Sequence, residues 1–402
     1  MHPHEYDGYI GFREASAEVA DFVVGKDCSF AVLGAWALNA QRNDPLHDMR
    51  PQGDAILRLP EDHTPLLLVT VDTEAEFDWS LPLSRNATSV RSVRYQTRAH
   101  AIFERYRIRP TYLVDYAVAT QEDGYKPLVE ILADDQCVIG AHLQPWENPP
   151  FVEDIAIRRN SYVGNLPAQL EREKLLALKH AIQDSFNLTP RVYRAGRFAV
   201  GPHTAATLLE LGFEIDTSVV PHTDFSREDG PDFTGFDVNP YWCGRGRQLF
   251  EIPLTVGFTG IFRQQGPAFA RLVFRPECVQ LHVPGIMARF RLLDRIRLSP
   301  EGIEFGELRR LVRQLLKAGH RIFSFTYHSP SLEPGNTAYV RNDRELRSFL
   351  DRFERFFDFF FGEAGGRAVT PIELRAIALQ LRMEGASIQE VSRPPTLSGM
   401  QA

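Results

Sequence analysis

Leu66-Leu67-Leu68-Val69-Thr70-Val71-Asp72-Thr73-Glu74 is the stretch of the sequence that decides the fold. Its apolar part predicts a buried β-strand, and two acids with one residue between them follow at the strand end. A carboxylate beside a buried strand costs free energy unless a metal, a cation or hydrogen bonds compensate it. Because α/β proteins place their chemistry at strand ends, Asp72 and Glu74 are candidates for a site. The alternative is that both are ordinary loop acids, one of them capping the next helix.

The rest of the chain alternates between strand and helix patterns. Further β-rich runs lie at Thr111–Val114, Cys137–Ala141, Val192–Tyr193, Phe213–Ile215, Leu249–Ile252 and Arg321–Phe325. Helical patterns lie at Val90–Arg107, Pro127–Asp134, Pro167–Phe186, Thr204–Leu211, Phe305–Ala318, Asp343–Gly362 and Pro371–Met383. This alternation predicts parallel β/α units, which can close into a barrel or form an open doubly wound sheet. No G-x-G-x-x-G or P-loop follows the first strand, which removes the main signal for a nucleotide-binding sheet.

The sequence divides into an irregular extension over residues 1–62, a β/α barrel over residues 63–391 and a polar, flexible tail over residues 392–402. Within the barrel, residues 257–300 are rich in Arg, Phe and Pro and fit neither pattern. We interpret that segment as an insertion that covers one mouth of the barrel.

Composition excludes several classes of protein. The 402 residues are 44% hydrophobic and 24% charged, as in ordinary globular proteins, and the net charge of −7 gives no footprint for nucleic acid. The four cysteines form no C-x-x-C pair and suggest no disulfide framework, which fits a reducing compartment. The start carries no visible signal peptide, and the apolar window 22–40 is broken by Lys26 and Asp27. We therefore expect no transmembrane segment and a cytoplasmic location.

Polar residues stand at the end of every predicted strand. They are Asp72 and Glu74, Asp115, His142 and Gln144, Arg194 and Arg197, Asp216, Glu251, and His328. In a barrel these ends converge on one mouth, so their coincidence favours a site over a set of unrelated structural roles. A carboxylate with an imidazole suits a divalent metal, most often zinc, which acidifies water and polarises a carbonyl. A second carboxylate as general base and a histidine as general acid would complete a site that hydrolyses an amide or ester.

With these residues, the chain resembles the polysaccharide deacetylase (NodB-homology) family from about Thr64 to Arg382. The resemblance implies a distorted (β/α)7 barrel, a carbohydrate substrate and a divalent metal. Four stretches carry it: Val69–Glu74, Ile139–Pro145, Tyr193–Arg197 and Phe325–Pro330. They imply that Asp72 is the general base, Glu74 and His142 are metal ligands, Arg194 orients the catalytic acid, and His328 is that acid. The run Ser329–Thr337 resembles a subgroup found near genes for bacterial cell-surface polysaccharides.

The second of these motifs departs from the family. Where the family has a second histidine, this chain has Trp146, and where the subgroup has one it has Gln144, whose neutral oxygen is a poor zinc ligand. Three interpretations follow. The metal is held by Glu74, His142 and a third ligand such as Asp72, or the site works without metal, as is thought of resembling cyclic-amide hydrolases, or catalysis has been lost. Gln144, Trp146 and Arg197 are the candidates for substrate binding, with Trp146 stacking on a sugar face.

The leading hypothesis is a hydrolase that removes an acetyl group, preferably N-acetyl, from a sugar of a glycan or glycan precursor. The alternatives are an inactive carbohydrate-binding barrel and a metal-independent hydrolase of C–N bonds other than peptide bonds. Glycoside hydrolysis by Asp72 and Glu74 ranks below these. Two acids at i and i+2 of one strand end lie too close for the roughly 6.5–9.5 Å that an inverting enzyme needs.

Overall fold

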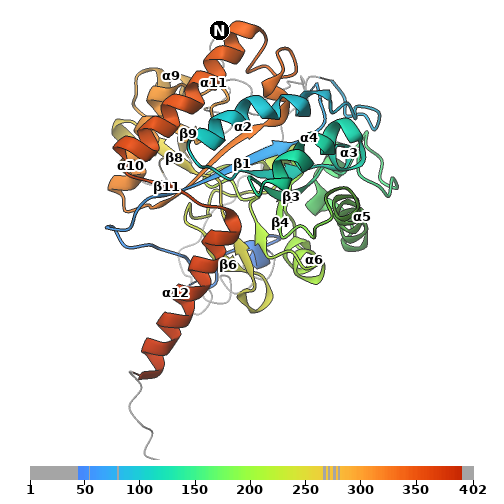
Figure 1. Cartoon of the computed structure of the whole chain (residues 1–402). Coiled ribbons are helices and arrows are strands. Elements are labelled where there is room, and N and C mark those ends of the chain that lie inside the picture. The colour runs from blue at the N-terminus through green and yellow to red at the C-terminus, as the bar shows by residue number, and fades with distance from the viewer. Residues whose placement is uncertain are drawn as a thin grey trace, which may run out of the picture.

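The computed structural model describes residues 44–53, 55–78, 81–265, 269, 272–274, 278 and 281–391 (Figure 1). The predicted tail and most of the predicted extension lie outside these residues, so the boundary at residue 62 stays a prediction. Residues 55–57 join the main sheet, because the Trp242 amide donates to the Ala55 carbonyl (3.0 Å) and the Leu57 amide donates to the Pro240 carbonyl (2.7 Å).

One nine-stranded sheet forms the centre of the molecule. Its parallel strands follow the order β10 (Ile322–His328), β1 (Leu66–Thr73), β2 (Thr111–Val114), β3 (Val138–Leu143), β4 (Val192–Ala195), β5 (Ile215–Asp216) and β7 (Leu249–Glu251). The short β6 (Tyr241–Cys243) runs antiparallel to β7 at the edge, and β11 (Arg367–Ala368) pairs with β1. This is the strand order of a β/α barrel that is open between β7 and β10. The predicted α/β fold, a distorted β/α barrel, is confirmed.

Two short irregular stretches, around Thr255 and around Leu298, bridge the opening between β7 and β10. The Leu298 amide donates to the Thr255 carbonyl (2.8 Å), and the Thr326 amide of β10 donates to the Leu298 carbonyl (3.2 Å). The Thr255 hydroxyl in turn accepts from the Ser324 amide (2.8 Å). The end of the segment that we expected to cover a mouth thus forms part of the barrel wall.

Helices surround the sheet. Their bounds are α2 Gln96–Arg105, α3 Tyr116–Thr120, α4 Glu122–Ala133, α5 Ala168–Phe186, α6 Thr204–Glu210, α10 Phe305–Lys317, α11 Asp343–Phe357 and α12 Pro371–Val391. Side chains fix several of the starts: Asn342 accepts from two amides at the start of α11, and Glu304 and Glu307 form a capping box on α10. The Phe-rich run ends α11 and continues as a π-helix (Asp358–Glu363), with Phe356, Phe357 and Phe360 buried against the barrel.

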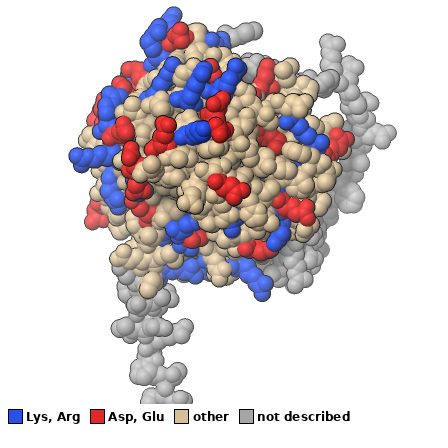
Figure 2. Space-filling view, turned by 45° about the vertical axis from the view of Figure 1, so that its right-hand side comes forward, with Lys and Arg blue, Asp and Glu red and all other residues tan. Residues whose placement is uncertain are grey.

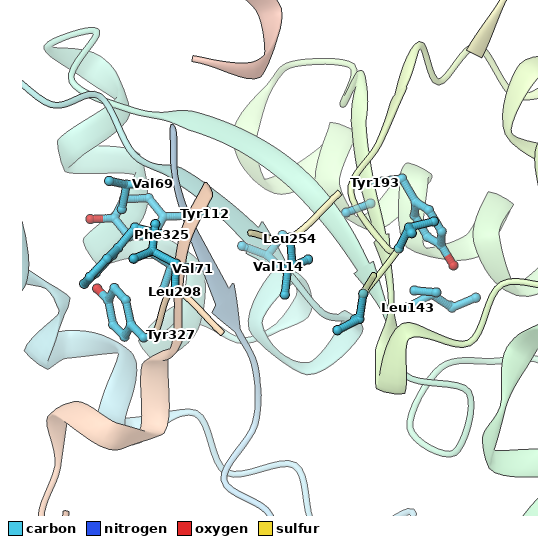
Figure 3. Packing of buried hydrophobic residues seen from close by; sticks show 14 of the residues in the cluster. Val69, Val71, Tyr112, Val114, Leu143, Tyr193, Leu254, Leu298, Phe325 and Tyr327 are labelled. Carbon is cyan, nitrogen blue, oxygen red and sulfur yellow. The ribbon is translucent and has the colours of Figure 1, made fainter. Parts of the chain in front are cut away.

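Strand alternation separates two apolar cores. Outward side chains such as Val69, Val71 and Phe325 pack beneath the helices (Figure 3). Inward side chains such as Leu66 and Leu68 fill the lower barrel, where α12 contributes Leu374 and Ala378. Further along the same inward face β1 carries Thr70 and Asp72, so the interior is apolar at one end and polar at the other.

The described surface is mixed in charge. Figure 2 shows Lys and Arg interspersed with Asp and Glu over one face of the molecule. Helix α12 leaves the barrel and extends away from it (Figure 1). None of the described helices has both the length and the apolar character needed to cross a membrane.

Candidate active site

Arg194 anchors the polar end of the barrel. This side chain is fully buried on β4, and its guanidinium contacts β1, β10 and the end of β5. Nη1 pairs with Asp72 Oδ1 and donates to Thr326 Oγ1 (3.0 Å), Nη2 donates to Thr70 Oγ1 (3.0 Å), and Nε donates to the Thr217 carbonyl (3.0 Å). Burial opposes ionisation of Asp72, but the positive charges of Arg194, His142 and His328 outweigh it and lower the pKa of this carboxyl. Asp72 is therefore a fixed carboxylate at neutral pH.

His328, at the end of β10, faces the other oxygen of Asp72. Its Nε2 lies 3.7 Å from Asp72 Oδ2, and its side chain is 28% exposed, so solvent reaches the space beside it. Its Nδ1 lies 2.7 Å from Glu301 Oε2. Burial alone would lower the pKa of His328, but Glu301, with smaller contributions from Glu74 and Asp72, raises it to about 10. The histidine is therefore an imidazolium at neutral pH.

Glu301 is a candidate site residue that the sequence did not indicate. It is buried, and its Oε1 accepts from the His328 amide (3.1 Å) and from the Ser331 hydroxyl (2.6 Å). Burial raises the pKa of Glu301, yet His328 and these hydrogen bonds lower it overall. Glu301 comes three residues after Leu298, which lies in the irregular part of the barrel wall. It does not end a predicted strand, so the strand pattern of the sequence does not indicate it.

Gln144 lies between Glu74 and His142. Its Nε2 is 2.7 Å from Glu74 Oε2 and 3.2 Å from His142 Nε2, and those two atoms are 3.4 Å apart. His142 Nδ1 lies 3.2 Å from the Arg194 carbonyl, to which its N–H donates. Burial alone would lower the pKa of His142, but Asp72 and Glu74 raise it overall. Gly196 makes room for this arrangement, because a Cβ there would lie 2.1 Å from Gln144 Oε1.

These residues do not fit the metal that the family implies. A catalytic zinc takes three protein ligands, whereas here an amide nitrogen lies between the two that remain, Glu74 and His142. Asp72, the third ligand that we considered, is held by Arg194. Over the described ranges, no three His, Cys, Asp or Glu side chains are grouped so that they could hold a metal ion. The zinc prediction therefore lacks a third ligand.

The loop that follows Gln144 is fixed by a buried lysine of α5. The buried Lys174 of α5 donates to the carbonyls of Pro145 (2.9 Å), Asn148 (2.6 Å) and Pro150 (2.7 Å). Trp146 in this loop is only 1% exposed, and its ring packs edge-on against Phe77 at 5.3 Å. The expectation that Trp146 stacks on a sugar does not agree with this burial, since no face of the indole is open to a ligand.

Arg197 also has a different environment from the one we expected. Its guanidinium donates to Ser161 Oγ (2.6 Å), the Tyr162 hydroxyl (2.7 Å) and Glu228 Oε2 (2.9 Å), and it lies over the Tyr162 ring. These contacts tie two loops together and use most of its donors. Its predicted role in substrate binding gains no support from them.

Two of the predicted mouth acids point away from the mouth. Ile215 and Phe250 belong to the core inside the barrel, so their neighbours Asp216 and Glu251 face the opposite side of the sheet. There the two acids lie side by side across β5 and β7, and burial raises the pKa of both. We expected Asp216 and Glu251 to meet the other strand-end groups, and this was wrong. Strands β5 and β7 are so short that the sequence does not show which of their residues face the inside of the barrel.

A second buried acid pair lies beside Glu74. Asp115 accepts from the amides of Ala75 (2.6 Å) and Val118 (2.7 Å), and the buried carboxyl of Glu147 lies close enough to perturb its pKa. Burial raises the pKa of Asp115 to about 6 and that of Glu147 well above its ordinary value. Asp115 was expected at this end of the barrel, whereas Glu147 was not singled out from the sequence.

Comparison with known proteins was made at three levels. No family model matches the sequence, and no curated protein matches it. The fold is nevertheless similar to several solved structures. Among them are polysaccharide and peptidoglycan deacetylases. The family and the cell-surface subgroup that the motifs indicate both stay predictions for this chain.

Three of these structures give the scale of the similarity. A protein from Mycobacterium smegmatis assigned as a polysaccharide deacetylase is 17% identical, with 88% of this chain and 100% of that chain covered and a TM-score of 0.47. A CE4-family pseudoenzyme from Bacillus anthracis is 9% identical (78% and 66% covered, TM-score 0.38). The catalytic domain of a peptidoglycan N-acetylglucosamine deacetylase from Eubacterium rectale is also 9% identical (79% and 92% covered, TM-score 0.34). At these values no activity carries over to this chain.

Proposed function

We propose that this protein is a hydrolase that removes an acetyl group, preferably N-acetyl, from a sugar of a glycan or glycan precursor. One observation carries the proposal: a carboxylate and an imidazolium face each other across 3.7 Å at the solvent-accessible end of the barrel. Each is held by a buried partner of opposite charge, Asp72 by Arg194 and His328 by Glu301. Two titratable groups whose pKa values are pushed apart form a base and an acid that are both in their active states at neutral pH.

The chemistry follows from these protonation states. A water molecule beside Asp72 gives its proton to Oδ2 as its oxygen attacks the acetyl carbonyl carbon. His328 Nε2–H then protonates the amine as the C–N bond breaks, which releases acetate and the free amino sugar. Glu301 keeps the imidazole oriented and charged throughout. In family members with a full ligand set a metal polarises the carbonyl, but the donors present here do not fit one, and no step of this mechanism uses it.

A second candidate is a barrel that binds carbohydrate without turning it over. The position of Gln144 favours it, because the amide joins Glu74 to His142 where the family's ligands would meet a metal. The two candidates make opposite predictions about acetate release, although both predict that an acetylated sugar binds at the same mouth.

The test is acetate release from a panel of N-acetylated sugars and oligosaccharides, with wild type and Asp72→Asn. The proposal predicts release by the wild type and at least a hundredfold slower release by the variant, with circular dichroism unchanged. Full activity of Asp72→Asn would contradict the mechanism. No release by the wild type, together with saturable binding of the same sugars in calorimetry, would establish the second candidate.

A further inference from the structure

Exposed apolar side chains concentrate in one part of the molecule. Residues 256–297, which we call the insertion, begin with β8 (Val256–Thr259), end with β9 (Asp294–Arg297) and contain α9 (Val283–Arg289). Its large exposed apolar residues are Ile261, Leu272, Leu281, Ile286 and Phe290, with Ile261 68% and Phe290 67% exposed. In Figure 1, α9 lies beside β9, and both lie near α10. Contiguous exposure of this kind in a folded protein marks a contact surface.

The exposed side chains are presented on an ordered frame. Val273 and Leu293 form a small core of the insertion, and Val283 and Met287 of α9 pack against it. Ile286 and Phe290, four residues apart, lie together on another face of the same helix. The backbone of Ile261 joins the end of α9, since its amide donates to the Arg291 carbonyl (3.1 Å). Three exposed apolar residues are thereby held close together.

Charge sets the insertion apart from the rest of the chain. It contains seven arginines and two acids, so it carries +5 in a chain whose total is −7, and the remainder carries −12. Arg263, Arg289 and Arg291 are exposed and lie next in sequence to the exposed apolar residues. None of the three forms an ion pair with any residue that the structure describes. The positive charge continues on α10, where Arg309, Arg310 and Lys317 line a groove of about 330 Å³.

We propose that Ile261, Arg263, Ile286, Arg289, Phe290 and Arg291 form a peripheral docking surface for an anionic lipid bilayer. The apolar side chains enter the headgroup boundary, and the arginines pair with lipid phosphates. A second copy of this chain fits the surface less well, because Arg263, Arg289 and Arg291 of the two copies would repel one another. The negative remainder of the chain favours an orientation in which the insertion faces the anionic surface.

This surface is connected to the acid–base pair along the chain. The insertion ends at Arg297, Leu298 lies in the barrel wall, and Glu301 holds His328 three residues later. The proposal does not depend on the proposed hydrolysis, since lipid binding is measured without a substrate.

The test is co-sedimentation with vesicles of phosphatidylcholine alone or with phosphatidylglycerol at about a third of the lipid. We expect the wild type to sediment with the anionic vesicles, to do so less with the neutral ones, and to be released by salt. Ile286→Ser/Phe290→Ser and Arg289→Gln/Arg291→Gln should each weaken partitioning by about tenfold or more. The matched controls are Val152→Ser/Ile157→Ser and Arg344→Gln/Arg347→Gln, which change equally exposed residues elsewhere and should bind like the wild type.

Three results would overturn the proposal. The wild type could fail to bind anionic vesicles, or both insertion variants could bind as well as the controls. The third is concentration-dependent self-association of the wild type, in analytical ultracentrifugation, that Ile286→Ser/Phe290→Ser abolishes in the absence of vesicle binding. That result would assign the surface to contacts between copies. Melting curves of all variants show whether the insertion variants remain folded.

Discussion

The two sides of the barrel mouth differ in how well they keep the arrangement that the motifs imply. On one side Asp72, Arg194, His328 and Glu301 form two opposed ion pairs with complementary protonation states. On the other side Glu74 and His142 remain, but an amide lies between them. The acid–base pair that we propose and the side where a metal would be held therefore depend on different neighbours, although Asp72 and Glu74 both lie at the end of β1.

The largest effect on acetate release is expected from replacing His328, the proposed general acid. His328→Gln removes the imidazolium that faces Asp72 Oδ2, so acetate release should fall by about 10²–10⁴-fold. The rate is measured on the best substrate of the panel. His320→Gln serves as the matched control, since His320 bonds to Asn239 and is not part of the mouth. A rate within threefold of the wild type for His328→Gln would contradict its role as general acid.

A smaller and pH-dependent effect is expected from Glu301→Gln. Glu301 raises the pKa of His328 to about 10, so its loss should return that pKa towards about 6.5. At pH 8 only about 3% of the imidazole would then be protonated, which predicts an activity about thirtyfold lower, whereas near pH 5.5 the variant should approach the wild type.

The measurement for Glu301→Gln is the pH profile of kcat/KM, with Glu304→Gln as control because Glu304 pairs with Arg352 on the barrel exterior. The wild type should stay active up to about pH 10, and the variant should lose activity as pH rises through neutrality. An equal loss at every pH would assign Glu301 a purely structural role.

The incomplete side is tested by Gln144→His. The substitution adds an imidazole as a third ligand beside Glu74 and His142, so the purified variant should bind close to one zinc ion per chain. The wild type should bind much less under the same dialysis. We expect acetate release to rise by about tenfold, as polarisation of the carbonyl by a metal is added to the existing base and acid. Gln144→Leu, which adds no ligand, is the control, and equal zinc content of all three proteins would contradict this interpretation.

The smallest effect is expected from the acid pair behind Glu74. The folded-state pKa values of Asp115 and Glu147 lie above their ordinary values, so this pair destabilises the fold increasingly as pH rises above about 4.5. Glu147→Gln replaces a buried acid by a neutral amide and should stabilise the protein by about 1 kcal/mol at pH 8. Near pH 4 the melting temperatures of variant and wild type should converge. A stabilisation independent of pH would point to packing instead.

Much of this architecture follows from the sequence, for a physical reason. Long strands such as Leu66–Thr73 bury both faces, and their apolar runs are visible without a structure. The motif residues Asp72, His142 and Arg194 come from β1, β3 and β4 and lie on the same inward face, so the strand order and register bring them together.

The remainder of the site depends on contacts that no local pattern encodes. Glu301 lies after an irregular wall segment, and Glu147 is recognisable only through its partner Asp115. Asp216 and Glu251 follow strands of two and three residues, too short for alternation to decide which way they face. Trp146 was assigned from its residue type, and only its packing on Phe77 shows that it belongs to the core.

The wall segment between β7 and β10 has an architectural consequence. The chain leaves the barrel at Thr255 and returns at Leu298, and the amide of the second donates to the carbonyl of the first at 2.8 Å. Residues 256–297 therefore leave the barrel and return to it at adjacent positions, so the insertion has its two ends side by side. Such a junction tolerates exchange, since a short turn or a foreign domain with adjacent ends can be joined there without cutting the sheet. The barrel thus offers one position at which new targeting properties can be acquired while the acid–base pair stays unchanged.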